Sequence, residues 1–184
     1  MSGREITYKV ENVVASVSLD DRIDLNKLSS NIAEAEYDPS QFPGLVLRLK
    51  DPKAAILVFN TGRMVVTGLR SEDDAPKVVS KIIDRIREAG IEIKSKPKIQ
   101  IQNIVASGNL GARLDLEIAS LTLEDALYEP EQFPGLIYRA KLPKVVFLLF
   151  CSGRIVCTGA KRETDVQEAV NKLDKILTEL EIYA

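Results

Sequence analysis

The sequence contains no histidine, only two cysteines and no long apolar run. Without histidine, the chain lacks the commonest general base and metal ligand of proteins. No segment approaches the roughly 18 apolar residues that a membrane span requires, and the opening segment MSGREITYKV is too polar for a secretory signal. We therefore expect a cytoplasmic protein without a metal, a cofactor or a membrane contact. The 184 residues, 45% of them hydrophobic and 28% charged, are enough for a packed globular core.

Cys151 and Cys157 are too few for a disulfide framework, and a metal site would need histidine partners. If the residues between them form a hairpin tip, their α-carbons lie about 13 Å apart. A disulfide requires about 7 Å or less. We expect two free thiols, either buried or in a loop.

The sequence consists of two copies of one pattern. The pentapeptide QFPGL occurs at 41–45 and again at 132–136, an offset of 91 residues. At that offset 34 of the 86 residues from 8 to 93 are identical to their counterparts in 99–184, without a gap. We therefore expect two copies of one fold, residues 1–93 and 94–184.

Each copy shows the same succession of hydrophobic patterns. A strand precedes a short amphipathic helix, QFPG interrupts the chain, three strands follow, and a long amphipathic helix ends the copy. The expected strands are 7–17, 45–49, 54–59 and 64–68, then 98–107, 136–140, 145–150 and 155–159, with 91–94 as a further short candidate. Because no Gly/Ser linker separates the copies, we expect an α+β fold in which roughly ten antiparallel strands form one pseudo-symmetric sheet, with four helices over one face.

The opposite face of the sheet is expected to lack a helical cover. Strands 54–59 and 145–150 are apolar at nearly every position, as in strands buried on both faces. Alternation along the strands places one set of side chains on the uncovered face: Leu57, Phe59, Arg63, Val65 and Thr67, with Leu148, Phe150, Arg154, Val156 and Thr158. This face either binds a ligand or packs against another subunit or the N-terminal segment.

Charge is distributed unevenly along the chain. The overall balance of 25 basic and 27 acidic residues argues against binding nucleic acid through bulk charge. Residues 44–70 and 135–161, however, together contain ten basic residues and one acidic residue, so these segments carry +9 and the remainder −11. Basic residues around an apolar sheet suit phosphates, whereas a homodimer interface gains nothing from them.

Aromatic and amide residues also recur at matched positions. Four of the five phenylalanines form repeat-related pairs beside loops, Phe42 with Phe133 and Phe59 with Phe150. Apolar wedges of this kind are inserted between base steps by minor-groove proteins. Asn12 and Asn103 lie in the first strand of each copy, where asparagine is unfavourable, and an amide there could donate to adenine N3 and thymine O2. The expected preference is for A·T over G·C pairs.

Together these motifs resemble the TATA-box-binding protein family in its compact archaeal form. ENVVAS with QNIVAS, QFPGL twice, and FNTGRMVVTG with FCSGRIVCTG carry the resemblance across essentially the whole chain. It implies a general transcription factor whose saddle-shaped sheet binds the bent minor groove of a TATA element on its concave side, with the helices on the convex side. Carried over by position, the central contacts would be Asn12, Val14, Asn103 and Val105. The kinking pairs would be Phe42 with Phe59 and Phe133 with Phe150. The floor would be Leu57, Val65, Thr67, Leu148, Val156 and Thr158, and the phosphate contacts Arg48, Lys53, Arg63, Arg139, Lys144 and Arg154.

The resemblance also implies protein partners. The family binds transcription factor B through a segment that maps onto Glu129, Glu131 and Gln132, and thereby recruits RNA polymerase indirectly. A homodimer is a further expectation when DNA is absent, and the site of action would be the nucleoid of a cell without a nucleus.

Two other classes of function remain open from the residues. TBP-like folds also occur as accessory domains of nucleic-acid enzymes, but we find no paired-carboxylate motif and no Gly-rich phosphate loop. A module that binds only proteins is the second alternative, and it would not retard a TATA duplex.

Overall fold

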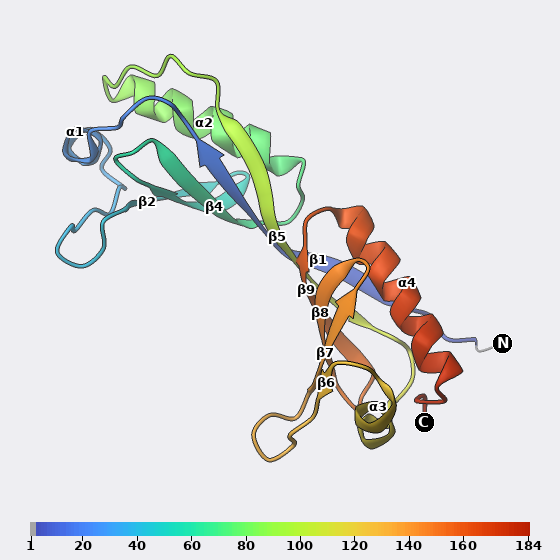
Figure 1. Ribbon diagram of the computed structural model, residues 1–184. Helices are drawn as coiled ribbons and strands as arrows, with labels where there is room; N and C mark the ends of the chain where they lie inside the picture. The colour runs from blue at the N-terminus through green and yellow to red at the C-terminus, as the bar shows by residue number, and fades with distance from the viewer. Residues whose placement is uncertain (1–2) are drawn as a thin grey trace. The chain divides into compact units, whose positions relative to one another are not determined.

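The computed structural model describes residues 3–184, so the first two residues of the predicted first copy lie outside the described part. Both copies have the predicted order of elements (Figure 1). The first contains β1 (Thr7–Ser18), α1 (Leu25–Asn31), β2 (Leu45–Lys50), β3 (Lys53–Val58), β4 (Arg63–Leu69) and α2 (Asp74–Glu88). The second contains β5 (Lys98–Asn109), α3 (Leu116–Thr122), β6 (Ala126–Leu127), β7 (Leu136–Lys141), β8 (Lys144–Leu149), β9 (Arg154–Ala160) and α4 (Glu163–Glu179).

The strands form one sheet of nine strands in the order β2-β3-β4-β1-β5-β9-β8-β7-β6. The α+β class and the antiparallel sheet with four helices are thus confirmed, with nine strands where roughly ten were expected. The candidate strand at 91–94 is wrong. Ile91 and Ile93 are buried, but the backbone N–H of Lys94 and of Ser95 donate to the Asp21 carboxylate, at 3.1 and 2.9 Å, instead of joining a strand ladder.

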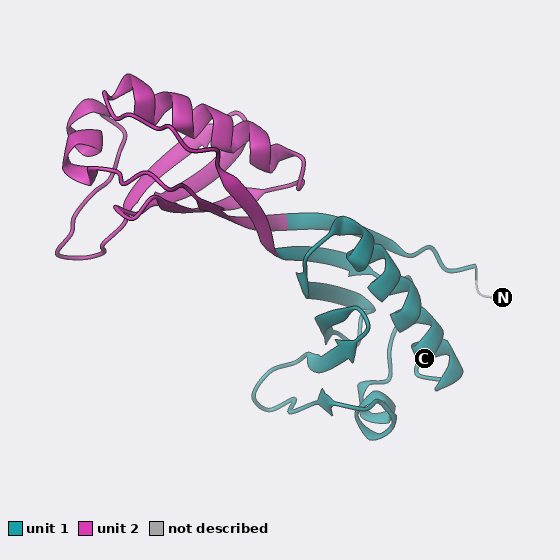
Figure 2. Ribbon diagram, turned by 45° about the horizontal axis from the view of Figure 1, so that its top comes forward, with its two compact units in different colours: residues 1–11, 103–184 teal, residues 12–102 magenta. Residues whose placement is uncertain are grey.

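The chain divides into two compact units, one of residues 12–102 (unit 2) and one of residues 1–11 and 103–184 (unit 1) (Figure 2). β1 and β5 each contribute one part to either unit, because the division falls within both strands. The predicted copies, residues 1–93 and 94–184, are repeats of a sequence pattern, whereas the units are compact parts of the structure. The limits of the copies therefore stay a prediction.

In unit 2 the core lies between the strands and the helices on one face. Alternate residues of β3 and β4 are buried, and so is the apolar side of α2; the largest contributors are Ile56, Val58, Met64, Val66, Val78, Val79, Ile82 and Ile86. The turn between β3 and β4 ends in Gly62 at φ +93°, where a Cβ would lie 2.2 Å from the Asp21 carbonyl oxygen. Only glycine fits at this turn.

Unit 1 repeats this core with different residues. β8 and β9 bury Val145, Phe147, Leu149, Ile155 and Cys157, and α4 buries Val166, Val170, Leu173 and Leu177. Gly153, at φ +95°, ends the turn equivalent to that at Gly62. No helix within residues 3–184 has the length and apolarity needed to cross a membrane.

Candidate nucleic-acid interface

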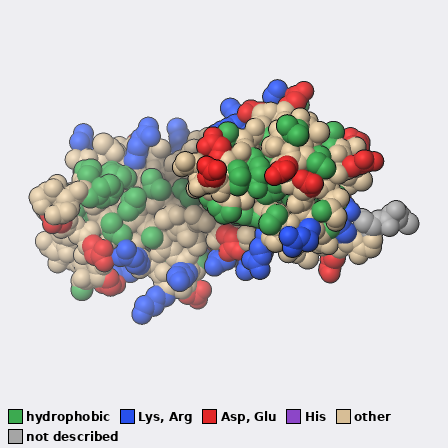
Figure 3. Space-filling view, turned by 90° about the horizontal axis from the view of Figure 1, so that it is seen from below, with side chains coloured by type: hydrophobic (Ala, Val, Ile, Leu, Met, Phe, Trp, Pro, Cys, Tyr) green, Lys and Arg blue, Asp and Glu red, His purple; other side chains and the backbone are tan. Residues whose placement is uncertain are grey.

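The predicted uncovered face is present in unit 2. In the register of the sheet Leu57 lies opposite Val65, Val65 opposite Ser16, and Thr67 opposite Ala55, so these side chains share one face. All are half-exposed, whereas their neighbours along the strands are buried against the helices. In Figure 3 Lys and Arg side chains, with some Asp and Glu side chains among them, border the apolar side chains of unit 2.

Unit 1 presents the equivalent face. Leu148 lies opposite Val156, Val156 opposite Ser107, and Thr158 opposite Val146, and each of these side chains is again half-exposed. Val14 and Val105 are half-exposed on β1 and β5, in unit 2 and unit 1 respectively. Each unit therefore has an apolar floor that no helix covers.

One pair of phenylalanines lies at the β3–β4 turn of unit 2, and another at the β8–β9 turn of unit 1. The Phe42 and Phe59 ring centroids are 5.9 Å apart in an edge-to-face arrangement, and those of Phe133 and Phe150 are also 5.9 Å apart. Phe42 and Phe133 remain 41% and 39% exposed, which is far above the exposure of a core phenylalanine such as Phe147 at 0%. The two ring contacts that the resemblance implied are therefore present, and their role in kinking DNA stays a prediction.

The glycine of each QFPGL segment makes room for the aromatic pair. A Cβ on Gly44 would lie 2.7 Å from Phe42 Cε2 and 3.0 Å from Phe59 Cε1. A Cβ on Gly135 would lie 2.7 Å from Phe133 Cε2 and 2.9 Å from Phe150 Cε1. The rings therefore pack directly against the backbone, which explains why phenylalanine and glycine recur together.

Asn12 and Asn103 have a structural contact that the sequence did not reveal. Asn12 Oδ1 accepts a hydrogen bond from the Gly68 N–H at 2.7 Å, and its Nδ2 donates to Thr67 Oγ1 at 3.4 Å. The same contacts join Asn103 to the Gly159 N–H at 2.6 Å and to Thr158 Oγ1 at 3.2 Å. Because a backbone N–H can only donate, the amide oxygen is held toward the glycine. Each Nδ2 carries a second N–H besides the one that faces the threonine hydroxyl.

These contacts occur where the strand ladders are irregular. The register between β1 and β4 shifts between Val13 and Ala15, and that between β5 and β9 shifts between Ile104 and Ala106. Such a bulge leaves a backbone group without a ladder partner. The side chain of the asparagine supplies that partner, so asparagine in mid-strand has a local structural cause, and its role toward DNA stays a prediction.

All six predicted phosphate contacts are exposed, namely Arg48, Lys53, Arg63, Arg139, Lys144 and Arg154. Two of them face like charges, because Lys53 lies opposite Lys50 and Lys144 opposite Lys141. Like charges in direct cross-strand pairs are destabilising, and an anion between them would remove that cost.

The two copies differ in the surroundings of a matched arginine, Arg48 on β2 and Arg139 on β7. The guanidinium of Arg48 forms an ion pair with Glu36 at 2.9 Å, with both side chains about two-thirds exposed. The residue that corresponds to Glu36 next to Arg139 is Leu127. To contact a phosphate, Arg48 would have to leave the Glu36 carboxylate, whereas the equivalent position in the second copy carries no carboxylate.

Several residues of the open face were missed from the sequence. Val46 lies opposite Leu57 and Ile137 opposite Leu148, so both extend the apolar floor. Ser107 Oγ donates to Glu11 at 2.6 Å, and Gln102 Nε2 donates to Ser16 Oγ at 2.8 Å. Extending the alternation of side chains from β3 to β2, and from β8 to β7, would have found Val46 and Ile137. The hydrogen bonds had no signal in the sequence.

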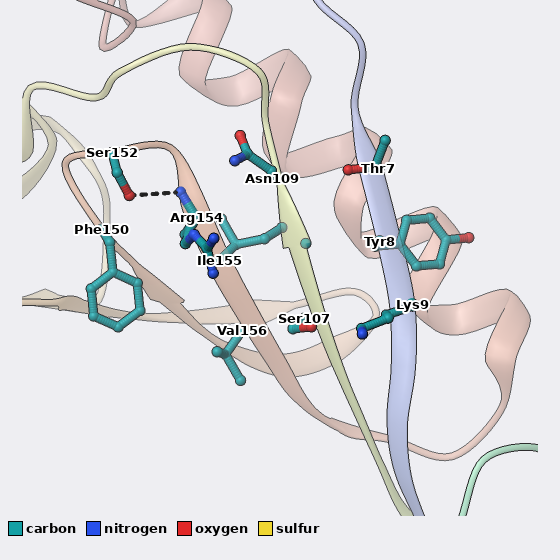
Figure 4. A pocket seen from close by; sticks show the side chains of 11 residues that line it. Thr7, Tyr8, Lys9, Ser107, Asn109, Phe150, Ser152, Arg154, Ile155 and Val156 are labelled. Atoms are coloured by element: carbon teal, nitrogen blue, oxygen red, sulfur yellow. Dashed lines mark hydrogen bonds between the residues drawn. The ribbon is translucent and has the colours of Figure 1, made fainter.

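A hollow of about 600 Å³ opens beside the floor of unit 1 (Figure 4). It lies between the start of β1 and the turn before β9, with Phe150, Val156 and Arg154 on one side and Tyr8 and Lys9 on the other. At one edge of the hollow, the backbone of β5 at Gly108 lies close to that of β1 at Thr7. Only glycine fits there, because a Cβ would lie 2.5 Å from the Thr7 carbonyl oxygen. The hollow therefore joins apolar and basic side chains of one unit.

The predicted protein-contact segment is an exposed, hydrogen-bonded turn. Glu129, Glu131 and Gln132 are all exposed. The Glu129 carbonyl oxygen accepts from the N–H of Gln132 at 2.9 Å and from that of Phe133 at 3.0 Å. The acidic side chains thus stand on an ordered backbone directly before the aromatic pair of unit 1.

The two thiols differ in environment. Cys151 is exposed at the turn between β8 and β9, and Cys157 is buried. Burial raises the pKa of the Cys157 thiol to about 12, so that it stays protonated near neutral pH. Within residues 3–184 no group of three or more Cys, Asp and Glu side chains is arranged to hold a metal ion.

Comparisons with known proteins agree with this geometry. The family described as "Transcription factor TFIID (or TATA-binding protein, TBP)" matches residues 7–89 and 98–180, one match for each copy. TATA-box-binding protein from Pyrobaculum islandicum is 55% identical over 174 residues, covering 95% of this chain and 87% of that protein. The protein of the same name from Sulfolobus acidocaldarius is 51% identical over 181 residues, covering 96% and 92%. The solved structure of TBP from Methanococcus jannaschii superposes with a TM-score of 0.85 at 45% identity, covering 94% of this chain and 98% of that one. The chain belongs to the TATA-box-binding protein family and shares its role as a general transcription factor.

Proposed function

We propose that the open face binds the minor groove of an A·T-rich TATA element. The observation that carries the proposal is the recurrence, in both units, of an uncovered apolar floor with an exposed phenylalanine pair at its end. Apolar floors complement the sugar edges of a widened groove, and the six exposed basic side chains complement the phosphates. The role is one of binding, without a chemical step.

The phenylalanine pairs act as wedges. Each pair is preassembled edge to face, and one ring of each is about two-fifths exposed. Inserting such a pair between base steps unstacks them and kinks the duplex. Pyrimidine–purine steps such as TA kink most easily, which adds selectivity without a direct base contact.

The two asparagines supply the direct readout. The second Nδ2 hydrogen of Asn12 and of Asn103 donates to adenine N3 or thymine O2. A G·C pair would bring the N2 amine of guanine against that donor. The Thr67 and Thr158 hydroxyls beside the amides extend the polar centre of each floor.

Bound DNA then recruits the remaining factors. Transcription factor B contacts Glu129, Glu131 and Gln132, and RNA polymerase follows through factor B. The chain acts on the chromosome, in the cytoplasm of a cell without a nucleus. Without DNA, the two apolar floors favour a homodimer.

A gel shift with a TATA duplex and a G·C-substituted duplex of equal length tests the proposal. We expect retardation of the TATA duplex at moderate salt and at least about tenfold weaker binding of the control, since each wrong base pair costs about 1–3 kcal/mol. Equal retardation of both duplexes would contradict minor-groove selectivity. No retardation of either would favour a module that binds only proteins.

A further inference from the structure

The second copy exposes apolar side chains where the first copy has polar ones. Three of them lie on α3 and β6, which are in contact: Ile118 is 39% exposed, Leu121 86% and Leu127 54%. We call these three residues the apolar patch. Their counterparts at the offset of 91 residues are Lys27, Ser30 and Glu36.

Folding does not require apolar residues at these positions. In unit 2 Lys27 Nζ donates to the Gly90 carbonyl oxygen at 2.9 Å, and Glu36 pairs with Arg48. The same elements are therefore stable with polar side chains. Leu121 is so exposed that it contributes almost no buried area to the fold. Grouped exposed apolar residues in one copy alone indicate a contact made by that copy.

Carboxylates without a salt bridge flank the apolar patch along the chain, although Asp125 lines a hollow together with Arg139, Lys141 and Lys144. Residues 115–131 contain six acidic residues and no basic one, and Glu117, Glu124, Asp125 and Glu129 are exposed. No salt bridge within the described part of the chain involves these four. On the side of unit 1 seen in Figure 3, acidic side chains stand around apolar ones.

The first copy neutralises the equivalent charge. Glu34, the counterpart of Asp125, pairs with Arg85 of α2 at 2.5 Å, and this arginine lowers the pKa of the Glu34 carboxyl. The residue that corresponds to Arg85 in the second copy is Ile176. Two independent differences between the copies, one in hydrophobicity and one in charge, thus coincide at α3 and β6.

We propose that α3 and β6 of unit 1 form a docking site for a basic amphipathic helix of a partner protein. The apolar stripe of that helix covers Ile118, Leu121 and Leu127, and its Lys and Arg side chains lie near Glu117, Glu124 and Asp125. Charge complementarity selects this occupant, because an acidic helix or a nucleic acid would be repelled. The proposal does not depend on the proposed DNA binding or on the contact at Glu129, Glu131 and Gln132.

The probe is a fluorescent synthetic helical peptide of leucine and lysine with the leucines on one face, titrated with the full chain. The variant Ile118→Lys, Leu121→Ser, Leu127→Glu installs the first copy's own residues and leaves the net charge unchanged. We expect it to bind the peptide at least about tenfold more weakly, a loss of about 1.4 kcal/mol. Replacing Glu117 and Glu124 by glutamine should weaken binding and flatten its dependence on salt.

Leu142→Asp is the matched control. Leu142 is 79% exposed on the turn between β7 and β8, outside the apolar patch, and its counterpart is Asp51. This control should bind the peptide at least as well as the unaltered chain. Equal losses in the control and in the patch variant would mean nonspecific adsorption and would overturn the proposal, as would undiminished binding by the patch variant.

Two further readouts separate the remaining outcomes. Sedimentation of the free chain tests for self-association. Self-association that is lost in the patch variant would mean that a second copy covers the apolar patch, and it would overturn the proposal of a partner helix. Leu121→Ser alone should retard the TATA duplex as the unaltered chain does, so failure of the DNA proposal is measured separately. In the triple variant Leu127→Glu supplies beside Arg139 the kind of carboxylate that Glu36 supplies beside Arg48, so TATA binding there should weaken about two- to fivefold. If the triple variant melts early, Leu121→Ser alone repeats the test, because that side chain is 86% exposed.

Discussion

At the scale of single residues, the asparagines of the first strands combine two functions in one amide. The oxygen of Asn12 satisfies the Gly68 N–H at the bulge, and the nitrogen provides a donor on the open face. Substitution by alanine would remove both, so a loss of selectivity could not be separated from a loss of stability. Aspartate retains the acceptor and removes the donor.

We therefore predict a selective effect for Asn12→Asp combined with Asn103→Asp. The ratio of affinities for TATA and G·C-substituted duplexes should fall about tenfold or more, since base readout contributes about 1–3 kcal/mol for each good contact. The added negative charge weakens both complexes alike and cancels in the ratio. The melting temperature should change little, and an unchanged ratio would contradict donation by these amides.

The phenylalanine pairs give a second prediction. Phe59→Ala or Phe150→Ala removes one edge-to-face partner, worth about 0.5–1.5 kcal/mol beyond the area that each partly buried ring covers. The total loss of folding stability should stay below the about 3–5 kcal/mol that truncating a core phenylalanine costs. DNA bending, measured by energy transfer between the duplex ends, should decrease strongly in both variants. A stability loss in the core range would show that the rings serve packing.

Glu36 is expected to compete with DNA phosphate for Arg48. Glu36→Gln should strengthen TATA binding about two- to fivefold, because an exposed ion pair is worth up to about 1 kcal/mol. Glu34→Gln is the control, since it makes the same charge change next to Arg85 of α2. Titration of a labelled TATA duplex, followed by fluorescence anisotropy, measures the affinity of each variant. Equal gains in both variants would indicate an effect of net charge alone.

At the scale of elements, hydrophobic period and turn glycines predicted the strands, the helices and the open face. Alternation placed Leu57, Val65 and Thr67 together because a strand has a period of two, and the ladder register confirms it. The bulges were not predictable, since a single inserted residue barely alters the pattern. The segment at 91–94 has the alternation of a strand, but the Asp21 side chain takes the place of a neighbouring strand.

The turn between β8 and β9 can be followed by its cysteine. Cys151 is exposed beside Phe150, whereas burial raises the pKa of Cys157 to about 12 and so suppresses its reactive thiolate at pH 8. Mild alkylation of the folded chain should therefore modify Cys151 alone, and both thiols only after unfolding. Mass spectrometry gives the stoichiometry. A TATA duplex should slow the reaction at Cys151, and an unchanged rate would contradict DNA contact at this turn.

At the scale of the whole molecule, uneven charge reconciles a net charge of −2 with DNA binding. Basic residues are concentrated in 44–70 and 135–161, and the acidic excess lies elsewhere. If all six predicted basic contacts neutralise phosphates, the logarithm of the association constant should fall with the logarithm of salt concentration with a slope of about −5. A slope close to zero in the salt series would mean that apolar contact alone holds the duplex.

The division within β1 and β5 has a consequence for the origin of the chain. Residues 3–11 precede the unit of residues 12–102 along the chain but belong to the other unit. Residues 98–102 likewise precede residues 103–184 but belong to unit 2. A lone copy of the repeat would therefore have to exchange its terminal strand segment with a second chain, as in a domain-swapped dimer. Gene duplication and fusion would make that exchange permanent. The two copies were then free to diverge separately, as the residues on α1 and α3 have done.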